Sequence, residues 1–205
     1  MRIGVLALQG AFIEHAAMLR RLGAEVVEVR LPKDLEGLDG LIIPGGESTT
    51  IGKLMARFGL EEPLKRMAAQ GTPIWGTCAG MIVLATDVGG SDQPRLGLMD
   101  VGVDRNAFGR QVDSFEADLP IEDLGELPFH AIFIRAPIVT RTGDSVHVLA
   151  SLPDGRVVAA EQGPLLATAF HPELTDDARF HQYFLDKIWA RRPPDSKFPI
   201  PSSRD

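Results

Sequence analysis

The sequence predicts an α/β fold with a doubly wound, mostly parallel central sheet flanked by helices and with an added antiparallel hairpin region. Near-continuous apolar runs at residues 3–8 and 41–43 are typical of strands that are buried on both faces of a parallel sheet. Apolar residues at helical spacing follow the first run, over residues 12–22. The hairpin is expected where residues 153–155, Pro-Asp-Gly, separate two further apolar runs.

The first half of the chain alternates strand and helix candidates. Gly23 directly follows residues 12–22 and is a favourable residue just beyond a helix end. Ser48 or a following threonine is expected to cap a helix that ends near residue 58. Together, the patterns predict strands at residues 3–8, 24–29, 41–43 and 73–75 and helices at residues 12–22, 48–58, 61–70 and 81–85.

The second half has more turn residues between its apolar runs. Residues 87–94 are polar and rich in glycine, which indicates a loop. We interpret residues 1–190 as a single domain and residues 191–205, with four prolines, as a loosely held tail. Strands are predicted at residues 129–134, 146–149, 157–160 and 165–170, and a last helix from Asp176 or Asp177 to Trp189.

The composition limits the classes of partner and compartment. The chain has 21 Lys and Arg against 28 Asp and Glu residues, and the net charge of −7 argues against nucleic acid and anionic membranes as partners. A single cysteine cannot form an internal disulfide, which fits a reducing, cytoplasmic setting. The N-terminal apolar run soon meets polar Gln9 and reads as a core strand rather than a signal peptide. No segment approaches the roughly 20 apolar residues of a membrane span.

The only cysteine, Cys78, stands in a tight turn between a strand candidate and a helix candidate. The turn reads Gly-Thr-Cys-Ala-Gly over residues 76–80. A strand, a Gly-x-nucleophile-x-Gly turn and a helix form the pattern of a nucleophile elbow, here with cysteine in place of serine. Such a turn presents the sulfur at the carboxyl end of a strand. The alternative is a buried structural cysteine that packs as a small hydrophobe, and the flanking glycines favour the nucleophile.

A thiol nucleophile needs a base, and the base needs a group that orients it. His171 ends a predicted strand, and Pro172 biases it toward an extended conformation, so the side chains of His171 and Glu173 can lie side by side. The alternatives are a loop histidine beside a helix-capping acid, or a metal site, for which no other Cys or His has ligand-like spacing. We interpret His130 and His147 as facing solvent or the sheet. His15 and His181 fall on helix patterns and are interpreted as structural.

A glycine-rich turn follows the strand candidate at residues 41–43 and reads Pro-Gly-Gly-Glu-Ser-Thr-Thr over residues 44–50. Gly45 and Gly46 can adopt backbone angles that other residues rarely reach, so an N–H there can face a reacting carbonyl as part of an oxyanion hole. The alternative is an ordinary strand-to-helix turn with a helix cap. A phosphate-binding loop is a weaker interpretation, since the Gly-Lys-Ser/Thr of a P-loop is absent.

Together, the elbow, the Pro-Gly-Gly-Glu-Ser turn and the His-Pro-Glu sequence at 171–173 resemble the motifs of class I, triad-type glutamine amidotransferases, which have a flavodoxin-like sheet. Within that family, several stretches are similar to the glutaminase subunit of pyridoxal 5′-phosphate synthase. These stretches are residues 6–15, 44–50, 106–111, 114–116 and 133–137.

The resemblance implies hydrolysis of L-glutamine to L-glutamate and ammonia, without a metal or another cofactor. The ammonia would pass to a synthase subunit, the expected protein partner, for the synthesis of pyridoxal 5′-phosphate (vitamin B6). By the same resemblance, Cys78 is the nucleophile, His171 is the general base and acid, and Glu173 is the orienting carboxylate. Neither nucleic acid nor membrane is expected as a partner.

The resemblance also implies how glutamine is held. The N–H of Ala79 and one N–H from Gly45 or Gly46 would form the oxyanion hole. A carboxylate suits the α-ammonium of glutamine, and an arginine suits its α-carboxylate because the guanidinium fork binds two oxygens. The sequence leaves open which of two arginines does so. The substrate contacts are expected from Gly46, Glu47, Ser48, Arg105, Ile134 and Arg135, with Glu47 at the α-ammonium.

Two other classes of function stay open at this level. One is a different α/β cysteine hydrolase, such as a deglycase or a protease with a similar elbow, and glutamine turnover with release of ammonia would separate it from a glutaminase. The other is a non-catalytic regulatory subunit of the same fold. Failure of a glutamine-analogue electrophile to label Cys78 would favour that second class.

Overall fold

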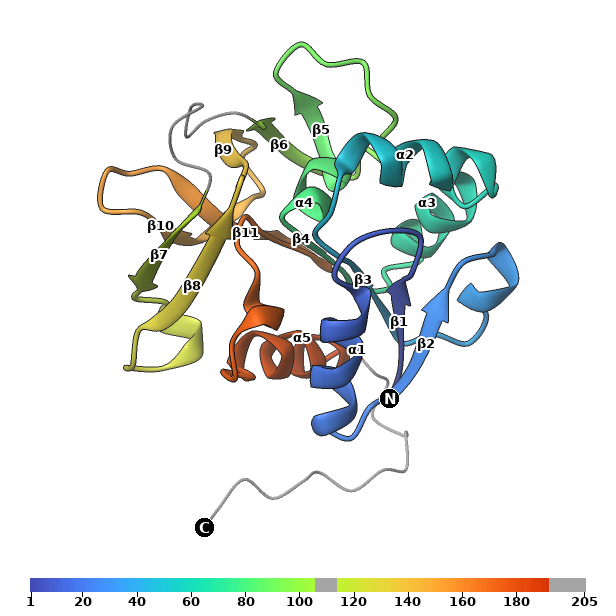
Figure 1. Cartoon of the computed structure of the whole chain (residues 1–205), viewed down its shortest axis with the longest axis horizontal. Helices are drawn as coiled ribbons and strands as arrows, with labels where there is room; N and C mark the ends of the chain where they lie inside the picture. The colour runs from blue at the N-terminus through green and yellow to red at the C-terminus, as the bar shows by residue number, and fades with distance from the viewer. Residues whose placement is uncertain (106–113, 192–205) are drawn as a thin grey trace.

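A ten-stranded mixed sheet forms the centre of the protein (Figure 1). The structure, a computed structural model, describes residues 1–105 and 114–191. One half of the sheet is entirely parallel, in the order β2-β1-β3-β4-β12. These strands confirm the parallel, doubly wound half that the apolar runs predict. They are β1 (Arg2–Leu6), β2 (Glu25–Val29), β3 (Gly40–Ile43), β4 (Ile74–Thr77) and β12 (Leu165–Thr168).

The other half of the sheet is mainly antiparallel and continues from β12 in the order β11-β9-β6-β5, with β10 also paired to β11. Only β5 and β6 run parallel to each other in this half. The pairing of β10 with β11 across residues 153–155 confirms the predicted hairpin. The strands are β5 (Ala85–Val88), β6 (Met99–Asp104), β9 (Ile138–Thr142), β10 (His147–Ser151) and β11 (Val157–Gln162).

A separate antiparallel sheet pairs β7 (Ser114–Leu119) with β8 (Phe129–Ile134). Phe115 and Phe133 stack across it, with ring centroids 4.4 Å apart. The Ile132 carbonyl accepts a hydrogen bond of 2.8 Å from the backbone N–H of His171. The small sheet is therefore joined to the segment that directly follows β12.

Helices cover both faces of the parallel half. A Cβ at Gly40 would lie 3.2 Å from the Phe184 ring of α5, and one at Gly80 of α4 would lie 3.2 Å from the Cβ of Ile43. Strand positions 40 and 43 point to opposite faces, so α5 and α4 cover opposite sides. α1 lies beside α5 (Figure 1). The helices are α1 (Phe12–Arg21), α2 (Ser48–Arg57), α3 (Glu61–Ala69), α4 (Ala79–Leu84) and α5 (Arg179–Trp189), with short 3-10 turns η1 (Pro32–Leu35), η2 (Glu122–Leu124) and η3 (Pro172–Leu174).

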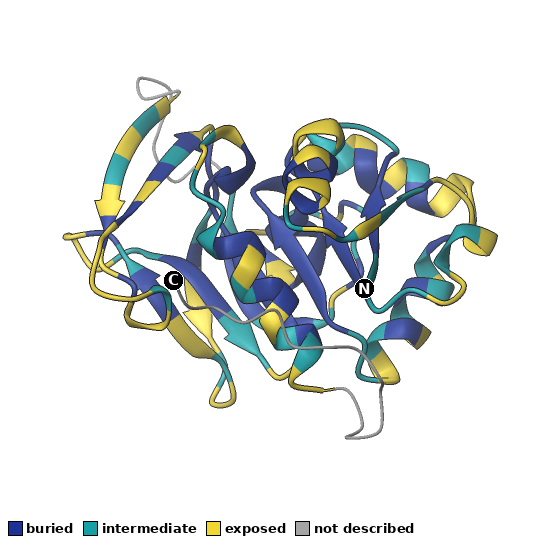
Figure 2. Ribbon diagram, turned by 90° about the horizontal axis from the view of Figure 1, so that it is seen from below, coloured by how far each residue is buried: buried dark blue, intermediate teal, exposed yellow. Residues whose placement is uncertain are grey.

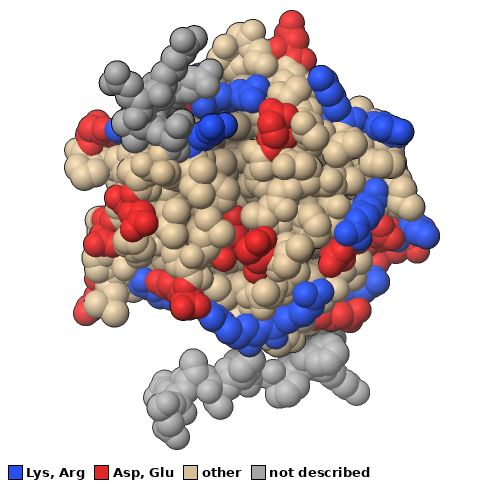
Figure 3. All heavy atoms as spheres, in the orientation of Figure 1, with Lys and Arg blue, Asp and Glu red and all other residues tan. Residues whose placement is uncertain are grey.

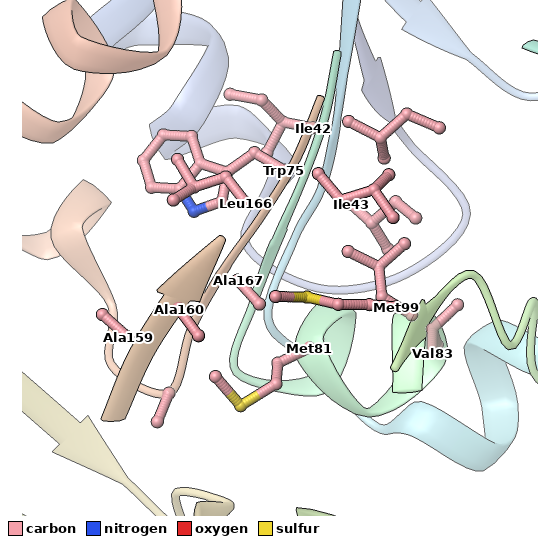
Figure 4. Close-up of a cluster of buried hydrophobic side chains, with 14 of the residues drawn as sticks. Ile42, Ile43, Trp75, Met81, Val83, Met99, Ala159, Ala160, Leu166 and Ala167 are labelled. Atoms are coloured by element: carbon pink, nitrogen blue, oxygen red, sulfur yellow. The ribbon is translucent and has the colours of Figure 1, made fainter. Parts of the chain in front are cut away.

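The central strands consist mostly of buried residues, and the helices beside them alternate buried and exposed residues (Figure 2). Ile42, Trp75 and Leu166 project to one side of the strands, and Ile43 projects to the other (Figure 4). On the first side, Trp75 packs against Phe184, with ring centroids 5.6 Å apart. Burying one such large apolar side chain stabilises the fold by about 1.5–3 kcal/mol. Packing of helices on both faces of the strands is therefore a main source of stability.

The N-cap of α2 differs from the prediction. Glu47, and not Ser48 or a following threonine, caps the helix, because its carboxylate accepts hydrogen bonds from the backbone N–H groups of Thr49 and Thr50 at 3.1 and 2.6 Å. Serine and threonine are common caps, but a carboxylate satisfies the same free donors and is favoured by the positive end of the helix.

Several element boundaries also differ. β5 occupies part of the segment 87–94 that the polar pattern predicts as a loop, and β6, β7 and β9 have no counterpart among the predicted strands. β7 alternates exposed and partly buried residues, so it lacks the apolar run that marks a buried strand. The last helix begins at Arg179 rather than at Asp176 or Asp177, and the Asp177 carboxylate accepts from the Arg179 N–H at 3.0 Å.

Two predicted features fall on parts of the chain that are not described. These are the stretch 106–111 and the tail 191–205, of which only Arg191 is described. In the part that is described, no helix is long and apolar enough to cross a membrane. On the face drawn in Figure 3, acidic and basic side chains lie among one another.

Candidate active site

Three neighbouring strands of the parallel half lead to the residues that the sequence singles out. β3 leads to the glycine turn, β4 to Cys78 and β12 to His171, and these strands lie next to one another in the sheet. The carboxyl ends of the strands are where open α/β sheets bind ligands. The sheet therefore gathers three distant parts of the chain at one edge.

Cys78 connects β4 to α4 in a strained conformation. Its backbone angles are φ 48° and ψ −104°, a region that residues with a side chain rarely adopt and that costs on the order of 1–3 kcal/mol. Its N–H donates to the Thr168 carbonyl at 2.8 Å, which ties the turn to β12. A Cβ at Gly76 would meet the backbone of Gly80, so the glycines allow strand and helix to approach closely. This is the elbow geometry expected from the sequence.

His171 and Glu173 form a buried pair behind the cysteine. His171 Nδ1 lies 2.7 Å from Glu173 Oε1, and the Glu173 side chain is fully buried. The route to this contact differs from the prediction. Pro172 and Glu173 lie in the 3-10 turn η3 rather than in an extended segment, and it is this turn that brings the carboxylate under the imidazole ring.

The electrostatics of the pair favour a protonated His171 beside an ionised Glu173. Burial lowers the pKa of His171, but its hydrogen bonds with Cys78 and Glu173 and the charges of both outweigh burial and raise it to about 10. Burial raises the pKa of Glu173, but His15 and the hydrogen bond from His171 outweigh burial and lower it. His171 is thus held as an acid next to the sulfur.

Gly45 lies directly against the cysteine and the histidine. A Cβ at Gly45 would overlap the His171 ring and would lie 3.3 Å from the Cβ of Cys78, so only glycine fits at this position. The Gly45 carbonyl accepts a hydrogen bond of 3.0 Å from the Ala11 N–H. Ala79 is the first residue of α4, so its N–H has no acceptor within the helix. Gly45 therefore lies against the reactive pair, and the oxyanion-hole role of Gly45, Gly46 and Ala79 stays a prediction.

A polar cluster beside this group joins Glu47 to Arg105. Arg105 Nη2 donates to Glu47 Oε1 at 3.2 Å, and its Nη1 donates to Gln93 Oε1 at 2.6 Å and to Thr49 Oγ1 at 3.3 Å. The buried Ser48 hydroxyl also donates to Gln93 Oε1, at 3.3 Å. The cluster fixes the side chains of three of the predicted substrate contacts.

Glu47 makes more contacts than the sequence suggests. Burial raises its pKa, but hydrogen bonds from the Thr50 hydroxyl and from the N–H groups of Thr50 and Thr49 outweigh burial and lower the pKa to about 2. With Arg105, these contacts use about all four acceptor positions of the carboxylate. An α-ammonium group would have to replace one of these partners, so the binding role of Glu47 stays a prediction.

Ile134 and Arg135 border the cysteine from the end of β8. The Ile134 carbonyl oxygen lies 3.8 Å from Cys78 Sγ. Arg135 has φ 45°, and it shares a positive φ with Cys78 alone among the non-glycine residues that the structure describes. Strained backbone of this kind is concentrated at functional sites.

The predicted site residues therefore fall into two adjoining groups. Gly45, His171 and Ile134 lie against Cys78, and Glu173 contacts His171, whereas Arg105 lies with the polar cluster. The turn from Gly45 through Gly46 and Glu47 to Ser48 connects the two groups along the chain, and Ala79 and Arg135 are the chain neighbours of Cys78 and Ile134. Among residues 1–105 and 114–191, no group of three or more His, Cys, Asp or Glu side chains is arranged to hold a metal ion.

The sequence pattern of the SNO glutamine amidotransferase family matches residues 5–190. The chain belongs to this family. A pyridoxal 5′-phosphate synthase subunit PdxT from Herpetosiphon aurantiacus is 64% identical over 188 residues, which cover 90% of this chain and 99% of that protein. The protein of the same name from Moorella thermoacetica is 62% identical over 188 residues, with 92% of this chain and 100% of that protein covered.

Two solved structures are similar in fold to this chain. One described as a glutamine amidotransferase superposes with a TM-score of 0.87 at 52% identity and covers 91% of this chain and 98% of its own. A putative GMP synthase subunit from Thermoplasma acidophilum has a TM-score of 0.65 at 20% identity, with 93% and 94% covered, and shows similarity of fold alone.

Two residues of the site region have no role in the sequence-based prediction. Gln93 lies in a polar, glycine-rich stretch, where nothing in the pattern distinguishes it from a loop residue. His15 lies on the buried face of α1, and its Nε2 is 3.4 Å from Glu173 Oε2. The apolar periodicity of α1 shows that His15 is buried, but the helix alone does not show that it faces Glu173.

Proposed function

We propose that the chain hydrolyses L-glutamine to L-glutamate and ammonia with Cys78, His171 and Glu173, and passes the ammonia to a synthase subunit that makes pyridoxal 5′-phosphate. The single observation that carries the proposal is the placement of these three residues. A strained elbow cysteine lies beside a histidine whose Nδ1 is 2.7 Å from a buried carboxylate. The names of the PdxT relatives support the choice of pathway.

The proposed chemistry uses two steps through a thioester. Cys78 Sγ attacks the side-chain amide carbon of glutamine, and the carbonyl oxygen becomes an oxyanion. His171 then donates its proton to the leaving ammonia as the C–N bond breaks, and a thioester remains on Cys78. Water attacks the thioester, His171 accepts the proton of that water, and glutamate leaves as the thiolate reforms.

The glycine turn and the elbow supply the oxyanion donors in this proposal. The N–H of Ala79 and one N–H from Gly45 or Gly46 face the oxygen on which the negative charge develops. Removing one such donor typically costs about 3 kcal/mol of transition-state stabilisation. Recognition of glutamine is assigned to Gly46, Glu47 and Ser48 of the glycine turn, to Arg105, which pairs with Glu47, and to Ile134 and Arg135 at the end of β8.

We also propose that the reaction takes place in the cytoplasm, because the single cysteine fits a reducing compartment and the pathway needs a second soluble subunit. We retain the proposal that residues 1–190 form one domain. The continuous ten-stranded sheet supports it, since the sheet joins strands from β1 at the N-terminus to β12 near its end.

The test follows the amide nitrogen of glutamine. The purified chain is mixed with the synthase subunit, the substrates of the synthase and glutamine labelled with ¹⁵N in the side-chain amide. The proposal expects labelled pyridoxal 5′-phosphate and one glutamate for each ammonia released. Absence of glutamate would overturn the function, and glutamate without labelled product would overturn the pathway.

Two variants serve as controls. Cys78→Ala should abolish glutamate formation, while added ammonium salt should restore the product, because the synthase then no longer needs glutamine. His171→Asn should be nearly as damaging, and the double variant little worse than either single one, since the two residues act as a unit. Turnover by Cys78→Ala would point to a different hydrolase site, and failure of a glutamine-analogue electrophile to label Cys78 would point to a non-catalytic subunit.

A further inference from the structure

Two histidines that the mechanism does not use lie buried behind the triad. His15 of α1 and His181 of α5 are both fully buried. His15 Nδ1 lies 2.9 Å from His181 Nε2, and its other nitrogen, Nε2, lies 3.1 Å from Thr77 Oγ1 and 3.4 Å from Glu173 Oε2. A chain of polar side chains thus runs from α5 through α1 to the triad carboxylate.

The environment keeps both imidazole rings neutral. Burial lowers the pKa of His15, against the attraction of the Glu173 carboxylate, and burial lowers the pKa of His181 well below its ordinary range. Each neutral ring carries one N–H, so the contact between the two rings must have one donor and one acceptor. Only two arrangements of the protons satisfy this condition.

The geometry selects one of the two arrangements. If His15 donated from Nδ1, its Nε2 lone pair would face the Glu173 carboxylate, and His181 Nδ1–H would be a buried donor without an acceptor among the described residues. If His181 donates from Nε2 instead, His15 carries its proton on Nε2, toward Glu173 and Thr77. His181 Nδ1 is then only an unpaired acceptor, which costs less than an orphaned N–H. The Thr77 hydroxyl fits either arrangement, since it can donate or accept.

We propose that His15 is a positioning residue of the triad, which directs its Nε2–H at the second oxygen of Glu173 while His181 holds His15 from behind. The inference rests on the proposed glutaminase function. Glu173 Oε1 lies 2.7 Å from His171 Nδ1, whereas Oε2 is buried and makes no hydrogen bond among the described residues. The nitrogen that approaches Oε2 is His15 Nε2, at 3.4 Å. His15 therefore supplies the donor that keeps the carboxylate ionised and turned toward His171.

Packing of α1 against α5 and Trp75 fixes the orientation of the His15 ring. Trp75 meets both histidine rings edge-on, with centroids 5.6 Å from His15 and 5.0 Å from His181, so neither ring can rotate without displacing the core. His15 touches neither the Cys78 sulfur nor the polar cluster around Arg105 in any contact that the structure gives. Its loss should therefore slow the chemical steps without weakening the binding of glutamine.

The test compares His15→Leu, which fills the space but has no donor, with His15→Gln, whose amide nitrogen can replace Nε2–H. Glutamine hydrolysis is measured with the full chain and its synthase partner. His15→Leu should lower kcat about tenfold and leave KM unchanged, because a factor of about ten corresponds to the loss of one hydrogen bond to a charged group. His15→Gln should recover most of this loss. In a Glu173→Gln background, His15→Leu should cost little more, because its effect passes through Glu173.

A packing variant provides the matched control. Phe184→Leu removes a buried ring from the same aromatic cluster on α5 but no polar contact, so it should lower the melting temperature and leave kcat unchanged. The inference is overturned if His15→Leu keeps the wild-type kcat. It is also overturned if Phe184→Leu, at the same melting temperature as His15→Leu, loses as much kcat, or if the loss of kcat from His15→Leu adds fully to that from Glu173→Gln.

A second measurement does not depend on activity or on a folded His15 variant. ¹⁵N NMR of histidine-labelled wild-type protein should show His15 and His181 neutral at pH 7, both protonated on Nε2. A His15 proton on Nδ1 overturns the inference even if glutamine is hydrolysed. Failure of the proposed function would show itself separately, as a wild-type chain that releases no glutamate.

Discussion

At the scale of single residues, backbone strain and buried charge meet at Cys78 and His171. Cys78 adopts a conformation that costs on the order of 1–3 kcal/mol, and the hydrogen bonds of the turn to β12 hold it there. Burial lowers the pKa of the neighbouring His171, but its pairing with Cys78 on one side and Glu173 on the other raises that pKa well above its ordinary value. In the proposed mechanism, the attacking sulfur and the acid that releases ammonia are therefore in place before substrate binds.

The titration of His171 tests this pairing. With a pKa of about 10, the His171 ring should remain protonated at pH 8. Cys78→Ala removes the hydrogen bond and charge of Cys78, which raise this pKa, and leaves the contributions of burial and Glu173 in place. NMR of the ring should therefore find a clearly lower pKa in the variant. An identical titration curve in both proteins would contradict the pairing.

The same pairing has a consequence for stability. The pKa of folded His171 lies above its ordinary value of 6.5, so the pairing stabilises the fold fully below pH 6.5 and the stabilisation is lost as pH rises through about 10. Thermal unfolding should show a larger difference between wild type and Cys78→Ala at pH 6 than at pH 10.

The two candidate arginines should differ from an ordinary surface arginine. Arg105→Ala and Arg135→Ala should each lower kcat/KM for glutamine, and the larger loss identifies the arginine at the α-carboxylate. Loss of a hydrogen bond to a charged group typically costs about 1.5–3 kcal/mol. Arg141→Ala is the control, because Arg141 forms a half-exposed ion pair with Asp100 on the antiparallel half of the sheet. Wild-type kcat/KM in both site variants would show that the assigned pocket is wrong.

At the scale of elements, helix α2 depends on a residue that is also assigned to substrate binding. The Glu47 carboxylate caps α2 through Thr49 and Thr50 and receives Arg105 on the same side. Glu47, at the end of the glycine turn, therefore stabilises helix α2. Binding and folding cannot be separated at Glu47 by activity alone.

Glu47→Gln should lower the free energy of unfolding by about 1 kcal/mol at pH 7, the usual worth of an N-cap. Because the pKa of Glu47 is lowered from 4.5 to about 2, this stabilisation is present above pH 4.5 and is lost as pH falls through about 2. Chemical denaturation at pH 7 and pH 2.5 should show the difference shrinking. Glu62→Gln removes an exposed carboxylate paired with Lys65 on α3 and should change stability much less. An equal loss in both variants would argue against the cap.

At the scale of the whole molecule, the glycine turn that is proposed to supply an oxyanion donor lies against a second loop, residues 9–11. The Gly45 carbonyl is held by the Ala11 N–H at the start of α1, and the Glu47 N–H donates to Gln9 Oε1 at 2.8 Å. The glycine turn can therefore change its peptide orientation only if its contacts with residues 9–11 change as well. A partner that touches either loop can bias the orientation.

We therefore expect the subunit alone to be a poor glutaminase that the synthase activates. If one oxyanion donor is turned away in the free subunit, basal kcat should be about 10²–10³ lower than in the complex. Glutamate production is measured with and without excess synthase. Equal kcat in both conditions would rule out this control and leave the triad assignment untouched.

The sequence by itself determined the parallel half of the sheet, because strands buried on both faces leave continuous apolar runs, and it determined the elbow, because the turn needs its glycines. The antiparallel strands were only partly predictable, since β6 and β9 of the central sheet and β7 of the separate sheet carry no such run, and β7 depends on pairing with β8. The placement of residues from different elements was decided by the tertiary structure alone. Arg105 could be recognised as a partner of Glu47, and His15 as a neighbour of Glu173, only after packing had brought distant side chains within a few ångströms of each other, because local patterns encode burial and not which side chain lies opposite.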